Sequence, residues 1–207
     1  GNRHIGEDLM ALKGVPIVSP TQAVVIKIDY GPGEGNAVYT ANPGGERFVY
    51  YHLDRIGEGV VEGQVLCQGS LIGYVGNTGS ASTTLPHLHF EIHDSSGTPT
   101  NPFVRLQKEF TVAEKMSFLS PILSQSKDPI ALANFLTTNF RSTFNKALAE
   151  GITLPAAISN VLGVTSQELS GEVAIASSAD LDVGSSGTAV LNLQKYLISA
   201  ASGSAAT

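Results

Sequence analysis

Glycine-bearing turns divide the first half of the chain into short runs of β-branched and aromatic residues. The runs with strand composition are 24–28, 48–53 and 87–92. Turns such as those at 31–33 and 76–79 lie between them. Short strands at this spacing predict an antiparallel sheet or sandwich, so residues 1–108 are expected to form a mainly β domain.

Helix formers replace this pattern from about residue 111, which predicts a helical region over 111–172. Asp128 and Pro129 have the character of a helix cap and a first-turn proline, and Gly151 that of a stop. One stripe between these signals holds Ile130, Ala133, Asn134, Leu136, Thr137 and Phe140, followed by Phe144 and Leu148. One helix is therefore expected between the cap and the stop, and a second near 155–162.

The last part of the chain is small and polar. Residues 173–180 have the Ser/Ala-rich composition of a linker. In the final segment, 181–207, Val190, Leu193 and Leu197 fall on one helix face. The tail after this helix is expected to be disordered.

Charge and composition exclude several classes of function. The formal net charge of −6 argues against nucleic acid, which selects basic surfaces. No apolar run approaches the length of a membrane span, so membrane insertion of this fragment is not expected. Cys67 is the only cysteine, which excludes an internal disulfide and a cysteine metal cluster. Because Cys67 lies in an apolar run, its thiol is expected to be buried and inert.

Two histidines on one predicted strand are the most informative polar pair. His87 and His89 lie two residues apart, so both imidazoles would share one face, while Leu88 and Phe90 point into the core. A metal would hold such neighbouring imidazoles neutral. An exposed strand face can also carry two histidines without function, and these four residues alone leave both interpretations open.

The remaining donors become informative in combination. His4 and Asp8 lie four residues apart, and Gly6 between them permits a path on which both side chains converge on one ion, although a plain surface pair is the alternative. His52, on another predicted strand, would by itself be an ordinary half-buried residue. Together these side chains supply two nitrogens, one oxygen and spare imidazoles, which suits a hydrolytic zinc site.

Glu91 and His93 continue the alternation of His87 and His89. Glu91 could orient an imidazole by accepting its second ring proton, or it could be a solvated strand residue. His93 is expected to lie at the surface.

The motifs, taken in order, resemble the lysostaphin-type zinc metallopeptidases, which are also called LytM-like peptidoglycan endopeptidases. The matching segments are 4–9, 14–17, 51–53, 61–65, 71–79, 86–92 and 101–102. The resemblance implies that residues 1–108 are a zinc metallopeptidase domain with the lysostaphin-like, mainly β fold.

The resemblance also implies a role for each site residue. His4, Asp8 and His89 would bind Zn2+, which activates water and polarises the scissile carbonyl. His52 and His87 would form the catalytic pair without binding the metal. His87 would act as general base or proton shuttle, and His52 would bind the oxyanion or protonate the leaving amine. Which histidine performs which step stays open at this level.

Two segments depart from or extend the resemblance. The loop 80–85 is longer than is usual in the family and has Leu85 where glycine is usual, which puts the cleavage preference in doubt. Residues 181–197 resemble the opening of a three-helix peptidoglycan-binding domain, although an ordinary amphipathic helix is the alternative. Too few residues follow to complete an independent core.

The function that the resemblance implies is hydrolysis of stem or cross-bridge peptides in bacterial peptidoglycan. The place of action would be the cell envelope or the outside of the cell. The chain starts at Gly1 without a signal peptide and is expected to be a fragment. The alternatives are a non-catalytic wall-binding or regulatory module of the same fold, and a zinc peptidase that cuts a glycine-rich protein.

Overall fold

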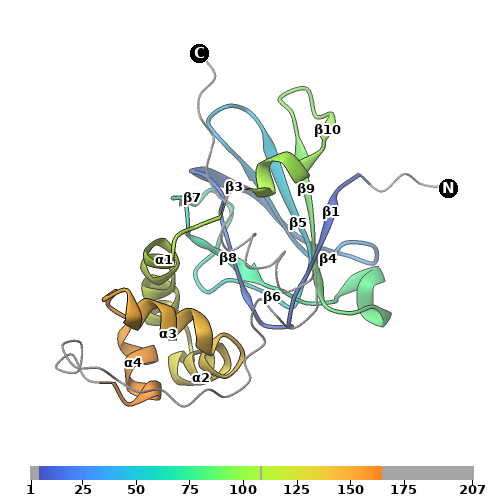
Figure 1. Cartoon of the computed structure of the whole chain (residues 1–207). Helices are drawn as coiled ribbons and strands as arrows, with labels where there is room; N and C mark the ends of the chain where they lie inside the picture. Colours follow the sequence, from blue (N-terminus) through green and yellow to red (C-terminus); the bar gives the residue numbers. More distant parts are fainter. Residues whose placement is uncertain (1–4, 108, 165–207) are drawn as a thin grey trace. The chain divides into compact units, whose positions relative to one another are not determined.

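The computed structural model describes residues 5–107 and 109–164, which divide into two compact units at Glu109 and Phe110 (Figure 1). Antiparallel strands build the first unit and helices build the second, which confirms the expected fold class. Within the described part of the chain, no helix combines the length and apolarity needed to cross a bilayer.

The described part of the β unit contains a main sheet of seven strands. Their order is β1-β9-β5-β4-β3-β7, and β10 also pairs with β9. The strands are β1 (Glu7–Met10), β3 (Ala23–Gly31), β4 (Gly35–Ala41), β5 (Arg47–Leu53), β7 (Val65–Leu66), β9 (His87–His93) and β10 (Pro99–Thr100). Strands β3, β5 and β9 lie where the apolar runs predict them.

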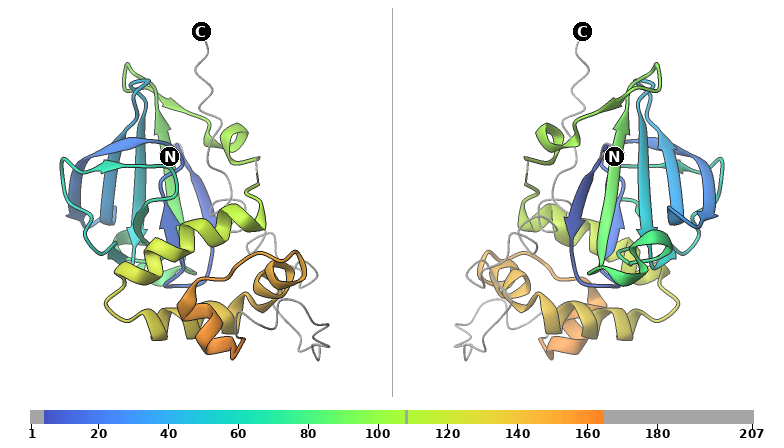
Figure 2. Two further views of the ribbon diagram at one scale, coloured as in Figure 1. Left: turned by 90° about the vertical axis from the view of Figure 1, so that its left-hand side faces the viewer. Right: turned by 90° about the vertical axis from the view of Figure 1, so that its right-hand side faces the viewer.

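A smaller sheet and two short 3-10 helices complete the β unit (Figure 2). The smaller sheet has the antiparallel order β2-β8-β6. Its strands are β2 (Pro16–Val18), β8 (Leu71–Tyr74) and β6 (Arg55–Ile56), and the 3-10 helices are η1 (Gly79–Thr83) and η2 (Pro102–Gln107).

Buried aromatic rings hold β5 against β9. The centroid of the Phe90 ring lies 5.9 Å from that of Phe48 and 5.4 Å from that of Tyr50, and all three residues are almost fully buried. Burial of rings at these separations is strongly favourable. Because side chains alternate along a strand, the same packing directs Tyr51 and His89 to the opposite face.

Cys67 is exposed, so the expectation of a buried thiol is wrong. It directly follows β7, a two-residue strand at the end of the sheet. The alternation of the chain buries Leu66 and turns the residues on either side outward, with Val65 at 63% exposure. An apolar run on an edge strand has only one face to bury.

The helical unit contains four described helices. They are α1 (Val112–Gln125), α2 (Pro129–Asn139), α3 (Arg141–Ala149) and α4 (Ala156–Leu162). Thr111 and Glu114 form a capping box at the start of α1, and the Asp128 carboxylate caps α2 as predicted. The predicted linker at 173–180 and the segment 181–207 lie outside the described residues.

The expected single helix between Asp128 and Gly151 is wrong, because the chain leaves helical geometry at Phe140, with φ −133° and ψ 36°. The break lets α3 bury Phe144 against the other helices. A continuous helix of this length would extend beyond the small core of the helical unit. Ile130, expected on the buried stripe, is 52% exposed.

Gly76 provides a test of how closely the chain packs behind the site. A Cβ atom added there would lie 2.1 Å from the backbone nitrogen of Asp54, which cannot move independently. Gly76→Ala is therefore expected to lower the free energy of unfolding by at least about 2 kcal/mol in urea denaturation. Gly33→Ala is the matched control, since its Cβ would meet nothing within 4 Å. Equal stability of the two variants would contradict this packing.

Candidate metal centre and active site

Strand β9 carries four polar side chains on one face, the last of which is His93. His87, His89 and Glu91 alternate with Leu88 and Phe90, which are buried in the core. The polar face is also largely covered, because the side chains of His87 and His89 are only 10% and 12% exposed. These histidines are therefore enclosed groups rather than residues of a solvated strand.

Strand β1 brings Asp8 to this face. It pairs antiparallel with β9, and Asp8 lies directly opposite His89 in the register. Oδ1 of Asp8 lies 2.8 Å from Nδ1 of His89 and 4.0 Å from Nε2 of His87. Pairing at the sheet edge thus joins residues that are 81 positions apart in the chain.

His52 reaches the site through an irregularity in β5. Regular alternation would put it on the core face with Tyr50. The pairing with β4 shifts between Tyr50 and Leu53, which adds a residue to β5 at this point. His52 consequently has a φ of +63°, and no other non-glycine residue in the described ranges has a positive φ. Its ring centroid lies 5.1 Å from that of His87.

Backbone carbonyls select the tautomers of His52 and His87. Nδ1 of His52 lies 3.0 Å from the carbonyl oxygen of Thr78, and Nδ1 of His87 lies 2.8 Å from that of Leu85. A carbonyl oxygen only accepts, so Nδ1 carries the hydrogen in each ring. Each neutral ring therefore keeps a lone pair on Nε2. Burial is the main factor that lowers the pKa of His52, which favours this neutral form.

His89 has the opposite arrangement. Its Nε2 lies 3.0 Å from Oε1 of Glu91, and its Nδ1 faces Asp8. Burial lowers the pKa of His89, but the hydrogen bonds with Asp8 and Glu91 outweigh it and raise the pKa to about 9. The Tyr51 ring stacks on His89 with centroids 5.7 Å apart and an interplanar angle of 10°. This imidazole is therefore held at both nitrogens and on one face.

Gly6 approaches the same imidazole closely. A Cβ atom at this position would lie 2.8 Å from Nε2 of His89 and 2.6 Å from the carbonyl oxygen of Phe90. Only a residue without a side chain lets the start of β1 lie against His89. The glycine expected to give the chain freedom to turn here thus also provides space for the ring.

The described side chains fit a divalent cation. An imidazole nitrogen and a carboxylate oxygen converge at His89 and Asp8, and the second ring nitrogen of His89 is bound to a carboxylate, as is typical of histidine ligands. Residues 5–107 and 109–164 contain no group of three such donors. The third ligand that the sequence predicts, His4, lies outside the described residues.

His93 is not the simple surface residue that the sequence suggests. Its side chain is 21% exposed, and its Nε2 lies 2.6 Å from Oε2 of Glu91. Glu91 is only 4% exposed, which excludes the solvated alternative. Burial raises the pKa of Glu91, but the hydrogen bonds with His89 and His93 outweigh it and the pKa is lowered. The spacing of these residues shows a shared face, but not which atoms meet.

Sequence reasoning missed Tyr51 as a part of the site. The motif that contains it drew attention only to His52, and strand composition made Tyr51 an ordinary aromatic residue. Burial raises the pKa of Tyr51, so its hydroxyl stays protonated, and it lies 3.3 Å from the hydroxyl of Tyr39. The signal that was available is its position beside His52 on the strand.

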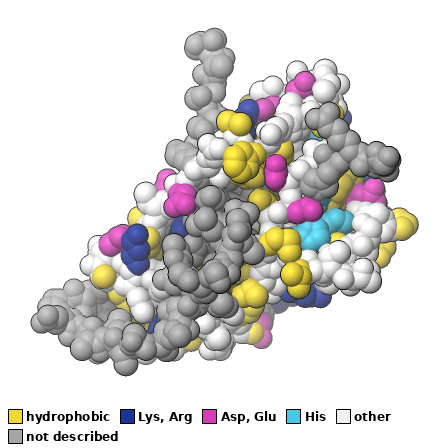
Figure 3. Space-filling model, turned by 45° about the vertical axis from the view of Figure 1, so that its right-hand side comes forward, with side chains coloured by type: hydrophobic (Ala, Val, Ile, Leu, Met, Phe, Trp, Pro, Cys, Tyr) yellow, Lys and Arg dark blue, Asp and Glu magenta, His cyan; other side chains and the backbone are white. Residues whose placement is uncertain are grey.

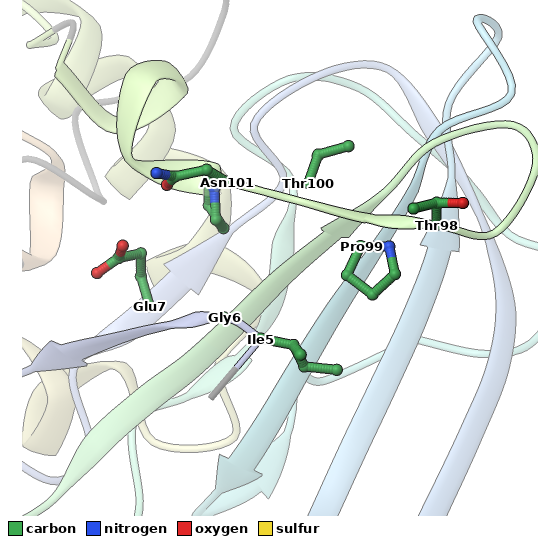
Figure 4. Close-up of a pocket in the computed structure, with 8 residues that line it drawn as sticks. Ile5, Gly6, Glu7, Thr98, Pro99, Thr100 and Asn101 are labelled. Atoms are coloured by element: carbon green, nitrogen blue, oxygen red, sulfur yellow. The ribbon is translucent and has the colours of Figure 1, made fainter. Parts of the chain in front are cut away.

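A pocket of about 410 Å³ lies next to the start of β1 (Figure 4). Ile5, Gly6 and Glu7 line one side, and the segment from Thr98 to Pro102 lines the other. Strands β1 and β10 pair with successive parts of the same edge of β9, and the pocket lies where one strand gives way to the other. In the space-filling view, histidine side chains reach the surface beside acidic ones (Figure 3).

Comparison with known proteins finds a family match within the β unit. Residues 2–102 match the sequence profile of peptidase family M23. The β unit is similar to peptidase family M23. This match spans the strands that carry Asp8, His52 and the polar face of β9, and it agrees with the resemblance seen in the sequence motifs.

Proteins similar to this chain include a protein of Haemophilus influenzae named as an uncharacterized metalloprotease. It is 35% identical over 121 residues, which cover 56% of this chain and 24% of that protein. The chain therefore spans about a quarter of the length of that relative.

Solved structures similar to the chain include two peptidases. A zinc-containing peptidase from Vibrio cholerae is 33% identical over 47% of this chain and 28% of that one, with a TM-score of 0.43. The catalytic domain of the antimicrobial peptidase lysostaphin from Staphylococcus simulans is 27% identical over 50% of this chain and 79% of that one, with a TM-score of 0.45.

The positive φ of His52 predicts an unusual order of stabilities. His52→Gly is expected to have a free energy of unfolding about 1–3 kcal/mol higher than His52→Val, because a β-branched residue is strained in the left-handed region. Urea denaturation measures the difference. On the same strand, exposed Arg47 has ordinary strand geometry, so Arg47→Val should be more stable than Arg47→Gly. The same order at both positions would rule out a strained His52.

The pKa of His89 predicts proton release on metal binding. At about pH 7.5, below its pKa of about 9, His89 is protonated in the metal-free protein. An ion that binds Nδ1 must displace that proton, so zinc binding should release about one proton and the apparent affinity should rise about tenfold per pH unit up to pH 9. Calorimetry in two buffers with different ionisation enthalpies measures this release. Glu91→Gln should reduce it, and heats independent of the buffer would contradict the assignment.

Proposed function

We propose that the chain carries a zinc-dependent endopeptidase that hydrolyses stem or cross-bridge peptides of bacterial peptidoglycan. The peptidase domain would span residues 1–108, with His4, Asp8 and His89 as zinc ligands and His52 and His87 as the catalytic pair. One observation supports this division best: His89 presents Nδ1 toward a carboxylate, whereas His52 and His87 both keep Nε2 for proton transfer.

The family match supports a metal as the cofactor, and the donor set supports zinc. An imidazole and a carboxylate, completed by a second imidazole from His4, leave a fourth position open, as in catalytic zinc sites. Bound by these residues, zinc would supply Lewis-acid activation of water and of the scissile carbonyl. Glu91 would keep His89 in the tautomer that binds metal.

The two other histidines would move protons. Nε2 of His87 lies 4.0 Å from Oδ1 of Asp8, the proposed ligand, which supports a role for His87 in taking a proton from the attacking water. The His52 ring lies beside both other imidazoles, with its centroid 5.1 Å from that of His87 and 6.0 Å from that of His89. We assign to His52 the protonation of the leaving amine. Nε2 of its neutral ring would first take up the proton released by the attacking water, and the protonated ring would then also donate to the oxyanion. The lowered pKa of His52 means that it meets the substrate as a neutral ring.

The substrate and the place of action follow from the family resemblance. Peptidoglycan peptides lie in the cell envelope, so the enzyme would act there or outside the cell. The loop 80–85, whose length and sequence depart from the family pattern, would border the substrate. The Leu85 side chain is 72% exposed while its carbonyl holds His87, so a change of this side chain can alter cleavage preference without moving the base.

Three variants separate metal binding from proton transfer. His89→Ala should lose both zinc and the clearing of a peptidoglycan suspension. His87→Ala should retain about one zinc per chain but lose about 10²–10⁴-fold in rate, because only the proton transfer is removed. Cys67→Ser, a change at an exposed residue, should leave both properties unchanged. Zinc content by mass spectrometry and the loss of turbidity with and without a chelator are the measurements.

Each contrary outcome has a distinct meaning. Full zinc content and clearing in His89→Ala would refute the ligand assignment. Wild-type protein that binds zinc but clears nothing would favour another substrate, such as a glycine-rich protein. Wild-type protein that binds peptidoglycan without zinc or cleavage would favour a wall-binding module.

A further inference from the structure

Glu91 joins two imidazoles inside the β unit. Its Oε1 lies 3.0 Å from Nε2 of His89, and its Oε2 lies 2.6 Å from Nε2 of His93. The residue is 4% exposed, so water does not readily replace either partner. A buried carboxylate oxygen that loses its donor carries a large desolvation cost. The two ends of this carboxylate are therefore coupled.

His93 is itself anchored to the turn between β9 and β10. Its Nδ1 lies 3.1 Å from the carbonyl oxygen of Gly97. Gly97 has a φ of +87°, and its amide donates to the carbonyl oxygen of Asp94, which closes the turn. A continuous series of hydrogen bonds thus runs from the turn backbone through His93 and Glu91 to His89.

The orientation of His89 depends on this series. Only the tautomer or ion with hydrogen on Nε2 donates to Glu91, and this leaves Nδ1 as the atom directed at Asp8. Without a donor from His93, the Glu91 carboxylate would turn its second oxygen toward another donor. It would then no longer hold Nε2 of His89 in a fixed direction.

We propose that His93 is a positioning residue for the metal centre, which fixes the ring of His89 through Glu91 while binding neither metal nor substrate. The proposal rests on the proposed zinc function and extends it to a residue outside the ligand set and the catalytic pair. Partners of ligating imidazoles in other proteins change affinity about 10–100-fold when removed.

The test uses the full chain and measures zinc affinity by competition with a chromophoric chelator. His93→Ala should weaken zinc binding about 10–100-fold. His93→Gln, whose amide nitrogen can occupy the place of Nε2, should recover most of the affinity. The visible absorption bands of the cobalt-substituted protein should shift in the alanine variant and return in the glutamine variant, because they report ligand geometry directly.

Asp94→Ala is the matched control for a structural effect of the turn. The Asp94 carboxylate accepts hydrogen bonds from the amides of Ser96 and Thr98, so its loss weakens the same turn without touching Glu91. Zinc affinity in this variant should stay within about twofold of wild type. An equal loss in Asp94→Ala and His93→Ala, or wild-type affinity in His93→Ala, would overturn the proposal.

Folding of each variant is checked by circular dichroism. If His93→Ala does not fold, His93→Leu and His93→Gln carry the same comparison, since both keep the volume and only glutamine keeps a donor. Equal zinc affinities of that pair would overturn the positioning role. If the wild-type chain binds zinc and clears peptidoglycan, and His93→Ala keeps the wild-type zinc affinity, only the positioning role is refuted. A wild-type chain without zinc refutes the proposed function and this inference together.

Discussion

The register between β5 and β9 is the constraint on which the proposed metal centre depends. It is set by the packing of Tyr50 and Phe48 on Phe90, three almost fully buried rings. Each such side chain contributes about 1.5–3 kcal/mol by leaving water. A slip of one residue would exchange the two faces of the strand and bury His89 in the core. The apolar face thus decides which polar side chains meet on the other.

Hydrogen-bond partners, rather than residue type, separate the proposed roles of the three histidines. Carbonyl oxygens hold Nδ1 of His52 and His87, whereas carboxylates face both nitrogens of His89. A carbonyl leaves the imidazole free to be neutral and to accept a proton at Nε2. Carboxylates instead stabilise positive charge on the ring, and a divalent cation can replace the proton that supplies this charge. Identical side chains can therefore serve as bases and as a metal ligand within one small site.

Close backbone approach is the second requirement of the site. Gly6 lets β1 lie against the His89 ring, and Gly76 lets the chain before β9 lie against the backbone at Asp54. Both glycines act through the space that a Cβ would fill. The amide of His87 donates to the carbonyl of Gly76, so the second approach also places the proposed base.

Alternating apolar and polar residues in 87–92 were enough to predict a strand with His87 and His89 on one face. The order of the motifs was enough to predict the similarity of the β unit to a peptidase family. Such features are written in consecutive residues, because strand period and turn chemistry are local properties. The prediction of His4 as a ligand still rests on sequence, since this residue lies outside the described ranges.

By contrast, the extra residue in β5 that turns His52 into the site arises from its pairing with β4. The contact of Asp8 with His89 and the exposure of Cys67 likewise depend on which strands are neighbours. Only the tertiary structure decided these features, because the atoms that determine them belong to segments distant in the chain.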